Sequence, residues 1–543
     1  MTNPNVTEAI SAKDLSAKIV HASRQFPPHA AYAPDYGTAG FRADAAYLDS
    51  TVFRCGLLMA VRALKTSETT GICITASHNP ARDNGVKLSE PTGEMLQQSW
   101  EPYANALARA EDDEALAREV RRVLDAEGVV PPAAGGPAVL LARDTRASGP
   151  RLVAAAAAGA AALGCSPVDL GELTTPQLHW AVSRHAAGLP FSREAYGEEL
   201  CGAFAELVEG AAPASGPLLL DCANGVGAAA VRQLAPSLRA AGLEVELRAV
   251  GDGELNGRCG ADYVQKSRSL PAGSEGAPAG GRCASLDGDA DRVVYWTAAS
   301  AAADSSVRLL DGDKIASLAA ILVARLARDL PEALRPSVGV VQTAYANGAS
   351  SDYLRDELGL EVLVTPTGVK HLHAAAHRFD VGIYFEANGH GTVLFSRALL
   401  ARLREAAPRE AAARRLLALS RAVNQTVGDA ISGVLLVEAA LRVLGWSLGD
   451  WEGIYADLPS RQLVVRVPDR TLVKTTDAER RVASPPELQA AVDAALRGVP
   501  RGRAFVRPSG TEDIVRVYAE AATPEATEAL AASVADAVRA VLG

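Results

Sequence analysis

Apolar and polar positions follow one another along this chain in blocks that predict βαβ units. In each block a short apolar run, typical of a buried strand, leads through a polar or glycine-bearing turn into a stretch rich in Ala and Leu. The clearest strand-like runs are 139–145, 217–225 and 337–343. The helix-like runs that follow strands include 151–163, 349–358 and 369–378. This alternation favours largely parallel sheets covered by helices, with functional loops at the carboxyl ends of the strands.

The pattern changes toward the end of the chain. Residues 402–421 are charged and helical, whereas 460–475 and 504–520 alternate apolar and polar side chains as strands do. A helix-like run, PEATEALAASVADAVRAVL, closes the chain. These features predict a small α+β domain at the C-terminus. A Gly- and Pro-rich patch at 271–281 predicts a surface insertion just before a strong strand.

Length and charge limit the class of protein. A chain of 543 residues gives a prior of three to four domains. The 54 Lys and Arg residues against 64 Asp and Glu residues leave a net charge of −10, which argues against a nucleic acid as partner. A local basic pocket for one small phosphate is still compatible with that total. The most apolar runs, 152–165 and 315–324, are shorter than the roughly 20 residues of a spanning helix, so no membrane segment is expected.

The cysteines and the N-terminus indicate a cytoplasmic protein. The seven cysteines are odd in number and none forms a CxxC pair, which is typical of reduced, isolated thiols. The first twenty residues lack a basic segment followed by an apolar one, so no secretory signal is expected.

The first candidate for chemistry is the segment GICITASHNPARDNGVK at 71–87. An apolar strand ends there in a loop, and Ser77 at the tip of the strand is expected to be exposed for chemistry. His78 could move a proton, and Lys87 could meet an anion. Ser, Asn and Pro are also ordinary turn residues, so a purely structural turn explains this segment equally well.

The second candidate is CASLDGDADRVVYW at 283–296. Three carboxylates, Asp287, Asp289 and Asp291, alternate there, and they repel one another strongly unless a cation neutralises them. Mg²⁺ takes oxygen ligands and often bridges to phosphate, so it is the expected ion. A solvated acidic turn is the alternative, but the apolar run that follows indicates that the loop enters buried structure.

Two further segments carry polar side chains suited to binding, one to sugar hydroxyls and the other to a phosphate. In YFEANGHGTVLFS, at 384–396, Glu386 and Asn388 suit hydrogen bonds to sugar hydroxyls, although a structural hairpin explains them as well. In FVRPSGTEDIVRVYAEA, at 505–521, a guanidinium, two hydroxyls and free backbone N–H groups gather in one turn and favour phosphate over a plain hairpin. The segment YGTAGFR, at 36–42, is by itself a weak signal.

Taken together, these motifs resemble the α-D-phosphohexomutase superfamily. The matching segments are TASHNP around Ser77, DGDADR at 287–292, the loop at 386–388 and RPSGT at 507–511, in that family's order and approximate spacing. Longer runs such as TGVKHLH at 367–373 and FEANGHGT at 385–392 are similar to the branch that acts on N-acetylglucosamine phosphates. The resemblance extends from about residue 30 to the C-terminus.

The resemblance implies an α/β fold of four domains in a heart-shaped arrangement, with the active site in a central cleft. Three related α/β domains with mixed sheets would precede a smaller α+β domain. The expected ranges are 1–185 with the phosphoserine loop, 186–305 with the metal loop, 306–440 with the sugar loop and 441–543 with the phosphate loop.

The resemblance also implies roles for individual residues. Ser77 would carry the phosphoryl group and, with Asp287, Asp289 and Asp291, would bind Mg²⁺. The expected catalytic residues around them are His78, Lys87, Arg42, Arg292 and His390. The expected residues for the sugar are Lys370, His371, Glu386 and Asn388. The expected residues for the phosphate that does not react are Arg507, Ser509, Gly510, Thr511 and Arg516.

The implied activity is an isomerase reaction that interconverts N-acetylglucosamine 6-phosphate and 1-phosphate and supplies UDP-N-acetylglucosamine biosynthesis. It would proceed through a phosphoserine enzyme and a 1,6-bisphosphate intermediate, with Mg²⁺ and a sugar 1,6-bisphosphate activator. The alternative is a mutase for glucose or mannose phosphates. A silent phosphosugar-binding relative is a third reading, but Ser77 and the carboxylate triplet are intact. The expected partner is the phosphosugar alone, and the expected state is a monomer or weak dimer.

Overall fold

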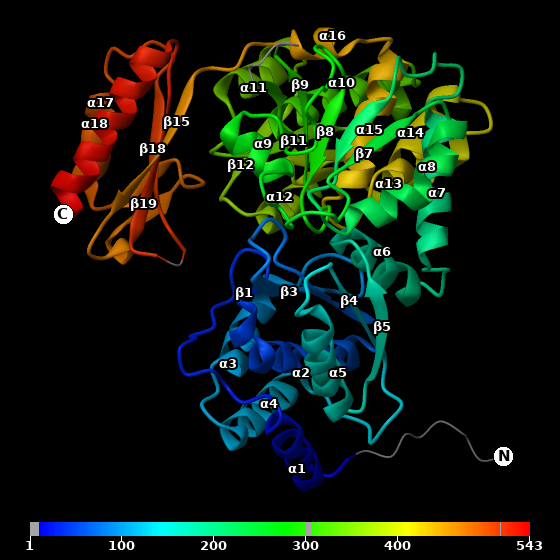
Figure 1. Cartoon of the computed structure of the whole chain (residues 1–543), viewed down its shortest axis with the longest axis vertical. Helices are drawn as coiled ribbons and strands as arrows, with labels where there is room; N and C mark the ends of the chain where they lie inside the picture. The colour runs from blue at the N-terminus through cyan, green and yellow to red at the C-terminus, as the bar shows by residue number, and fades with distance from the viewer. Residues whose placement is uncertain (1–9, 300–305, 511) are drawn as a thin grey trace. The chain divides into compact units, whose positions relative to one another are not determined.

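The structure is a computed structural model that describes residues 10–299, 306–510 and 512–543. The chain forms two compact units, each built from segments that are discontinuous in sequence. The first comprises 1–309, 390–392 and 418–443, and the second comprises 310–389, 393–417 and 444–543. Both contain mixed α/β structure, as the hydrophobic pattern predicts (Figure 1).

The first unit begins with a five-stranded mixed sheet. Its strands are β1 (Phe41–Asp44), β2 (Thr70–Ile74), β3 (Asp83–Ser89), β4 (Ala138–Arg143) and β5 (Ser166–Glu172). They lie in the order β1-β3-β2-β4-β5. Strand β3 is antiparallel to β1 and β2, whereas β4 is parallel to β2 and β5. The helices of this region are α1 (Ala12–Ser23), α2 (Asp49–Thr66), α3 (Glu101–Ala108), α4 (Asp113–Glu127), α5 (Gly149–Ala162) and α6 (Thr175–Ala186).

Small residues bring α2 and α5 into close contact. A Cβ added at Gly56 of α2 would lie 2.2 Å from the carbonyl oxygen of Ala156, and one at Gly159 of α5 would lie 2.1 Å from that of Phe53. The Ala-rich run that contains α5 is therefore a buried helix of this core, as its short length predicts. Among the described residues, no helix is both long and apolar enough to cross a membrane.

A second mixed sheet completes the first unit. Its strands are β6 (Leu218–Asp221), β7 (Val245–Arg248), β8 (Cys283–Leu286), β9 (Val293–Ala298) and β10 (Val307–Leu310), in the order β10-β9-β8-β6-β7. Strand β6 is parallel to β7 and β8, and β8 is antiparallel to β9. The helices here are α7 (Arg193–Leu207), α8 (Gly227–Ala240) and α9 (Ala261–Ser267).

The second unit contains a four-stranded sheet and the C-terminal sheet. The first has β11 (Val338–Thr343), β12 (Glu361–Thr365), β13 (Val381–Phe385) and β14 (Gly391–Phe395), in the order β12-β11-β13-β14. Strand β11 is parallel to both β12 and β13. Helices α10 (Gly312–Arg328), α11 (Gly348–Asp352) and α12 (Val369–Ala376) are interleaved with these strands. The helices that follow in sequence are α13 (Arg397–Ala406), α14 (Ala411–Ala422), α15 (Ala430–Leu444) and α16 (Leu448–Glu452). Of these, the end of α14 and nearly all of α15 belong to the first unit.

The C-terminal segment is α+β, as predicted. Strands β15 (Ser460–Arg466), β18 (Arg503–Pro508) and β19 (Ile514–Glu520) form an antiparallel sheet in the order β15-β19-β18. Strands β16 (Lys474–Thr476) and β17 (Arg481–Ser484) form a separate hairpin. Helix α18 (Pro524–Leu542) packs on this sheet, and α17 (Pro486–Ala495) packs against α18.

Two expectations from the sequence are corrected here. The alternation over 460–475 does not form one strand, because β15 ends at Arg466 and a short 3₁₀ turn separates it from β16. The patch at 271–281 is not purely a surface insertion, because Ser274 and Ala277 are buried, and Ala277 belongs to the core of the second sheet. Composition identifies the turns of this patch but not its anchoring side chains.

Candidate active site

The loop after β2 places Ser77 in a backbone conformation that side chains rarely adopt. Its φ is +48°, and its N–H donates to Thr75 Oγ1 at 3.0 Å. Its carbonyl oxygen accepts from Asn256 Nδ2 at 2.9 Å and from Arg146 Nη2 at 3.0 Å. The expectation that Ser77 is exposed is wrong for this structure: the residue is 1 % exposed, since polar groups enclose the loop that carries it.

A buried arginine holds this loop in shape. The Arg146 side chain lies against the loop and donates to four of its carbonyl oxygens, those of Ser77, Asn79, Pro80 and Asp83. It also pairs with Asp144 at 2.9 Å, and both side chains are fully buried. Because a guanidinium offers five N–H donors in a fixed plane, one side chain can satisfy several loop carbonyls at once.

The Ser77 hydroxyl reaches the acidic loop that follows β8. Ser77 Oγ donates to Asp289 Oδ2 at 3.1 Å. A Cβ added at Gly288 would lie 2.6 Å from the Ser77 carbonyl oxygen, so only glycine permits the two loops to approach this closely. The folded chain therefore brings together two motifs that are more than 200 residues apart in sequence.

All three carboxylates of the acidic loop are buried. One oxygen of each of Asp287, Asp289 and Asp291 lies within 4.8 Å of the other two. Burial and the two neighbouring carboxylates raise the pKa of Asp287 well above its usual value. Burial also acts on Asp291, but Lys87 and His390 outweigh it and lower the pKa of Asp291 well below its usual value.

Lys87 and Thr175 meet the same carboxylates. Lys87 Nζ lies 2.6 Å from Asp289 Oδ2 and 2.6 Å from Asp291 Oδ2. Burial alone would lower the pKa of Lys87, but these two carboxylates raise it, so the side chain is held as an ammonium ion. The Thr175 hydroxyl donates to Asp289 Oδ2 at 2.6 Å.

The acidic loop fits a divalent cation. Asp287 Oδ2 and Asp289 Oδ1 are buried and have no hydrogen-bond partner. Buried carboxylate oxygens without partners are costly, and a hard cation such as Mg²⁺ removes that cost by binding them. The donor set, three carboxylates with a serine oxygen beside them, is the one such an ion prefers.

Other predicted residues surround this cluster. His390 Nδ1 lies 3.2 Å from Asp291 Oδ1, and Arg292 Nε lies 3.8 Å from the same oxygen. Arg42 Nη1 donates to Asn79 Oδ1 at 2.9 Å. Burial and the nearby cations Arg292 and Arg42 lower the pKa of His78 well below its usual value, and its Nδ1 is buried without a hydrogen-bond partner.

The second unit holds the predicted sugar-binding turn after β13. Asn388 Nδ2 donates to Glu386 Oε2 at 3.3 Å, and the Gly389 N–H closes the turn on the Glu386 carbonyl oxygen at 2.8 Å. Gly389 has a φ of +87°. A Cβ at Gly312, the first residue of α10, would lie 1.8 Å from the same carbonyl oxygen. The turn therefore packs directly on the start of α10.

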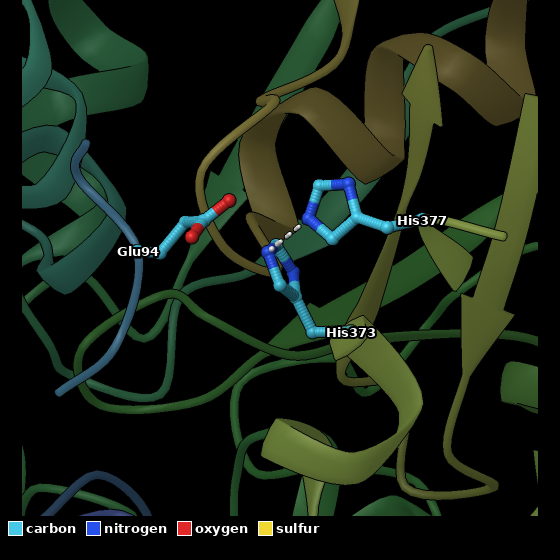
Figure 2. Close-up of side chains that lie close together, drawn as sticks. All are labelled: Glu94, His373 and His377. Atoms are coloured by element: carbon cyan, nitrogen blue, oxygen red, sulfur yellow. Dashed lines mark hydrogen bonds between the residues drawn. The ribbon is translucent and has the colours of Figure 1, made fainter. Parts of the chain in front are cut away.

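Lys370 and His371 lie half-buried in the first turn of α12. Further along, His373 Nε2 and His377 Nε2 lie 3.3 Å apart, and Figure 2 shows this contact between the two nearly perpendicular rings. His373 Nδ1 also lies 2.9 Å from the Tyr384 hydroxyl. The contact with Tyr384 attaches α12 to β13.

The predicted phosphate loop connects β18 and β19. Arg507 and Arg516 are directly opposite one another in the ladder of these strands. Arg507 Nε donates to Glu479 Oε1 at 2.9 Å. Ser509 is buried, and its hydroxyl accepts from the Glu512 N–H at 3.3 Å.

The predicted phosphate loop also includes Gly510 and Thr511. Gly510 is exposed, and a Cβ there would meet no atom within 4 Å. Thr511 lies outside the described residues.

Sequence reasoning missed several residues that contact the loops. Arg146 follows the strand-like run at 139–145, and polar residues at a strand's carboxyl end are a usable signal. Thr175 lies in the run LTTPQLH at 173–179, whose residue types alone suggest no role. Asn256 and Glu479 carry no local signal, because only the fold brings them to Ser77 and Arg507.

Family models match three parts of the chain. "Phosphoacetylglucosamine mutase AMG1, domain III" matches residues 311–446. "Phosphoglucomutase/phosphomannomutase, C-terminal domain" matches 465–537, and the alpha/beta/alpha domain I of the same family matches 56–115 and 113–190.

Full-length relatives and solved structures agree with these matches. The phosphoacetylglucosamine mutase of Arabidopsis thaliana is 48% identical and aligns over 97% of this chain and 99% of its own length. That of Homo sapiens is 44% identical over 93% of each chain. The Aspergillus fumigatus N-acetylphosphoglucosamine mutase in complex with GlcNAc-6P and magnesium superposes with a TM-score of 0.90 at 43% identity, over 98% of this chain and 100% of that one. The same fungal protein in complex with glucose 1,6-bisphosphate gives a TM-score of 0.89 at 43% identity, over 97% and 98% of the two chains.

Proposed function

This chain belongs to the phosphoacetylglucosamine mutase family, and on that premise we propose how its own residues interconvert N-acetylglucosamine 6-phosphate and 1-phosphate. The chain is a phosphotransferase-type isomerase that acts on a phosphosugar. The similarity to acetylglucosamine enzymes over nearly the whole chain speaks against the alternative, a mutase for glucose or mannose phosphates.

The contact between Ser77 and Asp289 is the observation that carries the proposal. The hydroxyl of Ser77 lies among three buried carboxylates, two of which have an oxygen without a hydrogen-bond partner. A neutral serine hydroxyl has no need of three carboxylates. Carboxylates at this place would instead bind a cation, and the cation would neutralise a phosphoryl group on Ser77. We assign Ser77 as the residue that carries the phosphoryl group.

Asp287, Asp289 and Asp291 would hold Mg²⁺ beside the Ser77 phosphate. When bound, the ion supplies positive charge close to the group that is transferred. Lys87 adds a second positive charge at the same carboxylates, and its raised pKa keeps it charged. Arg292, which lies close to two of these carboxylates, would offset charge on the same group.

The transfer itself moves one phosphoryl group between two oxygens. The bond from phosphorus to Ser77 Oγ breaks, and a bond from phosphorus to the free hydroxyl oxygen of the sugar forms. The hydroxyl proton has to leave, and the freed Ser77 Oγ has to gain one. His78, next to Ser77, is assigned to move this proton, which requires that bound substrate offset the burial and the cations Arg292 and Arg42 that lower its pKa. The resulting 1,6-bisphosphate then returns its other phosphoryl group to Ser77. Arg42 and His390 are assigned to line the site and assist the movement of charge.

Residues of the second unit are assigned to the substrate. Glu386 and Asn388 share one turn and would bind sugar hydroxyls, with Lys370 and His371 orienting the ring. The phosphate that does not react would bind the β18–β19 loop, for which the assigned residues are Arg507, Ser509, Gly510, Thr511 and Arg516. Hydroxyls, backbone N–H groups and two guanidinium groups can accept a phosphate from either end of the sugar.

The domain division and the cellular setting are also part of the proposal. We retain four domains, 1–185, 186–305, 306–440 and 441–543, because each larger sheet is drawn almost entirely from one range; β10, at the start of the third range, joins the sheet of the second. A cytoplasmic location is supported by seven buried cysteines that form no disulfide. A sugar 1,6-bisphosphate is the expected activator, as the bisphosphate complex of the fungal relative suggests.

A coupled assay of four substrates tests the function. The 6-phosphates of N-acetylglucosamine, glucosamine, glucose and mannose are supplied in turn with Mg²⁺ and a bisphosphate activator. We expect the highest kcat/KM for N-acetylglucosamine 6-phosphate. Equal or better turnover of glucose 6-phosphate would overturn the assignment in favour of the hexose phosphate alternative.

A further inference from the structure

We propose that Glu479 is the internal counter-ion of the phosphate site, and that the phosphate of the substrate has to displace it from Arg507. This inference rests on the proposed function, in which Arg507 binds the phosphate that does not react. Neither the motifs nor the matched families point to Glu479, which lies in the turn between β16 and β17.

Both oxygens of Glu479 are engaged, each by a different part of the second unit. Oε1 accepts from Arg507 Nε at 2.9 Å. Oε2 accepts from the Thr367 N–H at 2.9 Å and from the Thr367 hydroxyl. The Glu479 and Arg507 side chains are only 18 % and 19 % exposed. The carboxylate therefore connects the predicted phosphate loop to the turn that leads into α12.

The placement of the two arginines explains why a counter-ion is needed. Arg507 and Arg516 are directly opposite in neighbouring strands, so their side chains emerge on the same face of the sheet. Like charges in this arrangement repel one another unless an anion lies near. Burial would lower the pKa of Arg507, but the Glu479 carboxylate and the Tyr345 hydroxyl outweigh burial and raise it. The Glu479 carboxylate of the same chain is this anion.

The turn that carries Glu479 is built in an unusual conformation. Asp477, Ala478 and Glu479 have φ values of 52°, 53° and 67°, a region of backbone conformation that residues other than glycine rarely occupy. Arg480 stabilises the turn by donating to the carbonyl oxygen and the carboxylate of Asp477. Three consecutive residues adopt this conformation, and it directs the Glu479 carboxylate at Arg507.

A substrate phosphate and the Glu479 carboxylate compete for the same guanidinium. A dianion at Arg507 gains a charge-assisted hydrogen bond but meets the negative charge of Glu479. Phosphate binding is therefore weaker than Arg507 and Arg516 alone would allow. Weaker binding suits a site that has to release one phosphate and accept the other within each catalytic cycle. Displacement would also free the contact of Glu479 with Thr367, close to Lys370 and His371.

The variant Glu479→Gln tests the proposal by the sign of its effect. It removes the negative charge and keeps the shape, so we expect the KM for N-acetylglucosamine 6-phosphate to fall about five-fold or more. The inhibition constant of inorganic phosphate should fall in parallel. If Glu479 instead served only to orient Arg507, both constants would rise. A rise or no change overturns the proposal.

Two further variants keep the test independent of folding and of the proposed function. Thr367→Val removes one hydrogen bond that holds Glu479, and it should lower the KM by a smaller factor, about two-fold; an increase contradicts the proposal. Arg507→Gln should raise the KM and abolish the effect of Glu479→Gln in the double variant. If Arg507→Gln leaves the KM unchanged, the phosphate assignment itself is wrong. Glu487→Gln, an exposed change of the same charge in α17, is the matched control and should leave the KM unchanged.

Discussion

At the scale of single residues, the site is organised around buried charge. Asp287, Asp289 and Asp291 are buried together, and Lys87 is the ammonium group that contacts two of them. Removing one member leaves the others uncompensated in a medium where charge is costly. Substitutions of these four residues should therefore lower stability as well as turnover and metal affinity.

Ser77→Ala should reduce mutase turnover by about three orders of magnitude or more, because the residue that carries the phosphoryl group is lost. The loop should persist, since its bonds to Arg146 and Asn256 use the main-chain carbonyl oxygen of residue 77. A coupled assay with substrate and bisphosphate supplied measures the loss, and circular dichroism checks the fold. Ser166→Ala, at an exposed serine of β5, is the control. Full activity of the Ser77 variant would remove its assigned role.

Thr175→Val should weaken Mg²⁺ activation about ten-fold or more, because the hydroxyl that donates to Asp289 orients a proposed metal ligand. In the unmodified chain EDTA should stop turnover and added Mg²⁺ should restore it. The activation constant is read from a Mg²⁺ titration of the steady-state rate. Thr175→Ser keeps the hydroxyl and should restore most of the affinity. Equal activation constants for all three chains would contradict the orienting role.

At the scale of elements, loops are held by atoms that come from distant segments. Arg146 satisfies four carbonyl oxygens of the Ser77 loop, and the start of α10 supports the turn that carries Glu386. The local pattern of apolar and polar positions places Arg146 at the end of a strand, but it does not show which loop Arg146 or α10 supports, since that pattern reports which face of an element is buried.

Arg146→Met should destabilise the first unit by about 3 kcal/mol or more, because it leaves the Asp144 carboxylate buried without its partner. Activity should fall with it, since the Ser77 loop loses four hydrogen bonds. Denaturant titration followed by fluorescence measures the loss. Arg143→Met, at the end of β4 and three residues before Arg146, breaks a partly exposed pair with Glu172 and should cost under about 1 kcal/mol. Equal losses for the two variants would refute the distinction.

Gly312→Ala should raise the KM several-fold and lower stability by about 1–3 kcal/mol, because its Cβ would overlap the Glu386 carbonyl oxygen. Steady-state kinetics and thermal unfolding measure the two effects. Gly202→Ala, in α7 where no atom lies within 4 Å of the added Cβ, should instead be neutral or slightly stabilising. A Gly312 variant as active and as stable as the Gly202 variant would show that the turn does not depend on α10.

At the scale of the whole molecule, net charge and exposed apolar side chains affect self-association. The net charge of −10 disfavours self-association through general repulsion. The large apolar side chains found exposed in the described ranges come from five separate segments, at Val130, Val168, Leu189, Val464 and Leu472. Tight obligate interfaces instead need a large contiguous apolar surface.

Light scattering coupled to size exclusion should therefore give a mass near 56.4 kDa, or a concentration-dependent rise toward the dimer. The measurement is made at micromolar concentration and physiological salt, so that surface repulsion is screened as it is in cells. A stable tetramer at the lowest measurable concentration would contradict the expectation.

The sequence by itself determined the elements and the chemistry of the motifs. The period of apolar positions located several strands and helices, including α18, and the carboxylates 287, 289 and 291 were predicted as a cation site because their spacing is local. The division of 460–475 into two strands could not be predicted, because a 3₁₀ turn and a short strand share the alternation of one long strand. Local spacing carries information only about neighbours in sequence.

Only the tertiary structure decided which distant groups meet. Ser77 reaches Asp289, Arg146 and Asn256 hold the Ser77 loop, and Glu479 meets Arg507 through contacts between segments that no local pattern connects. The physical reason is that a buried polar group has to find its partner wherever the fold places one, at any separation along the chain.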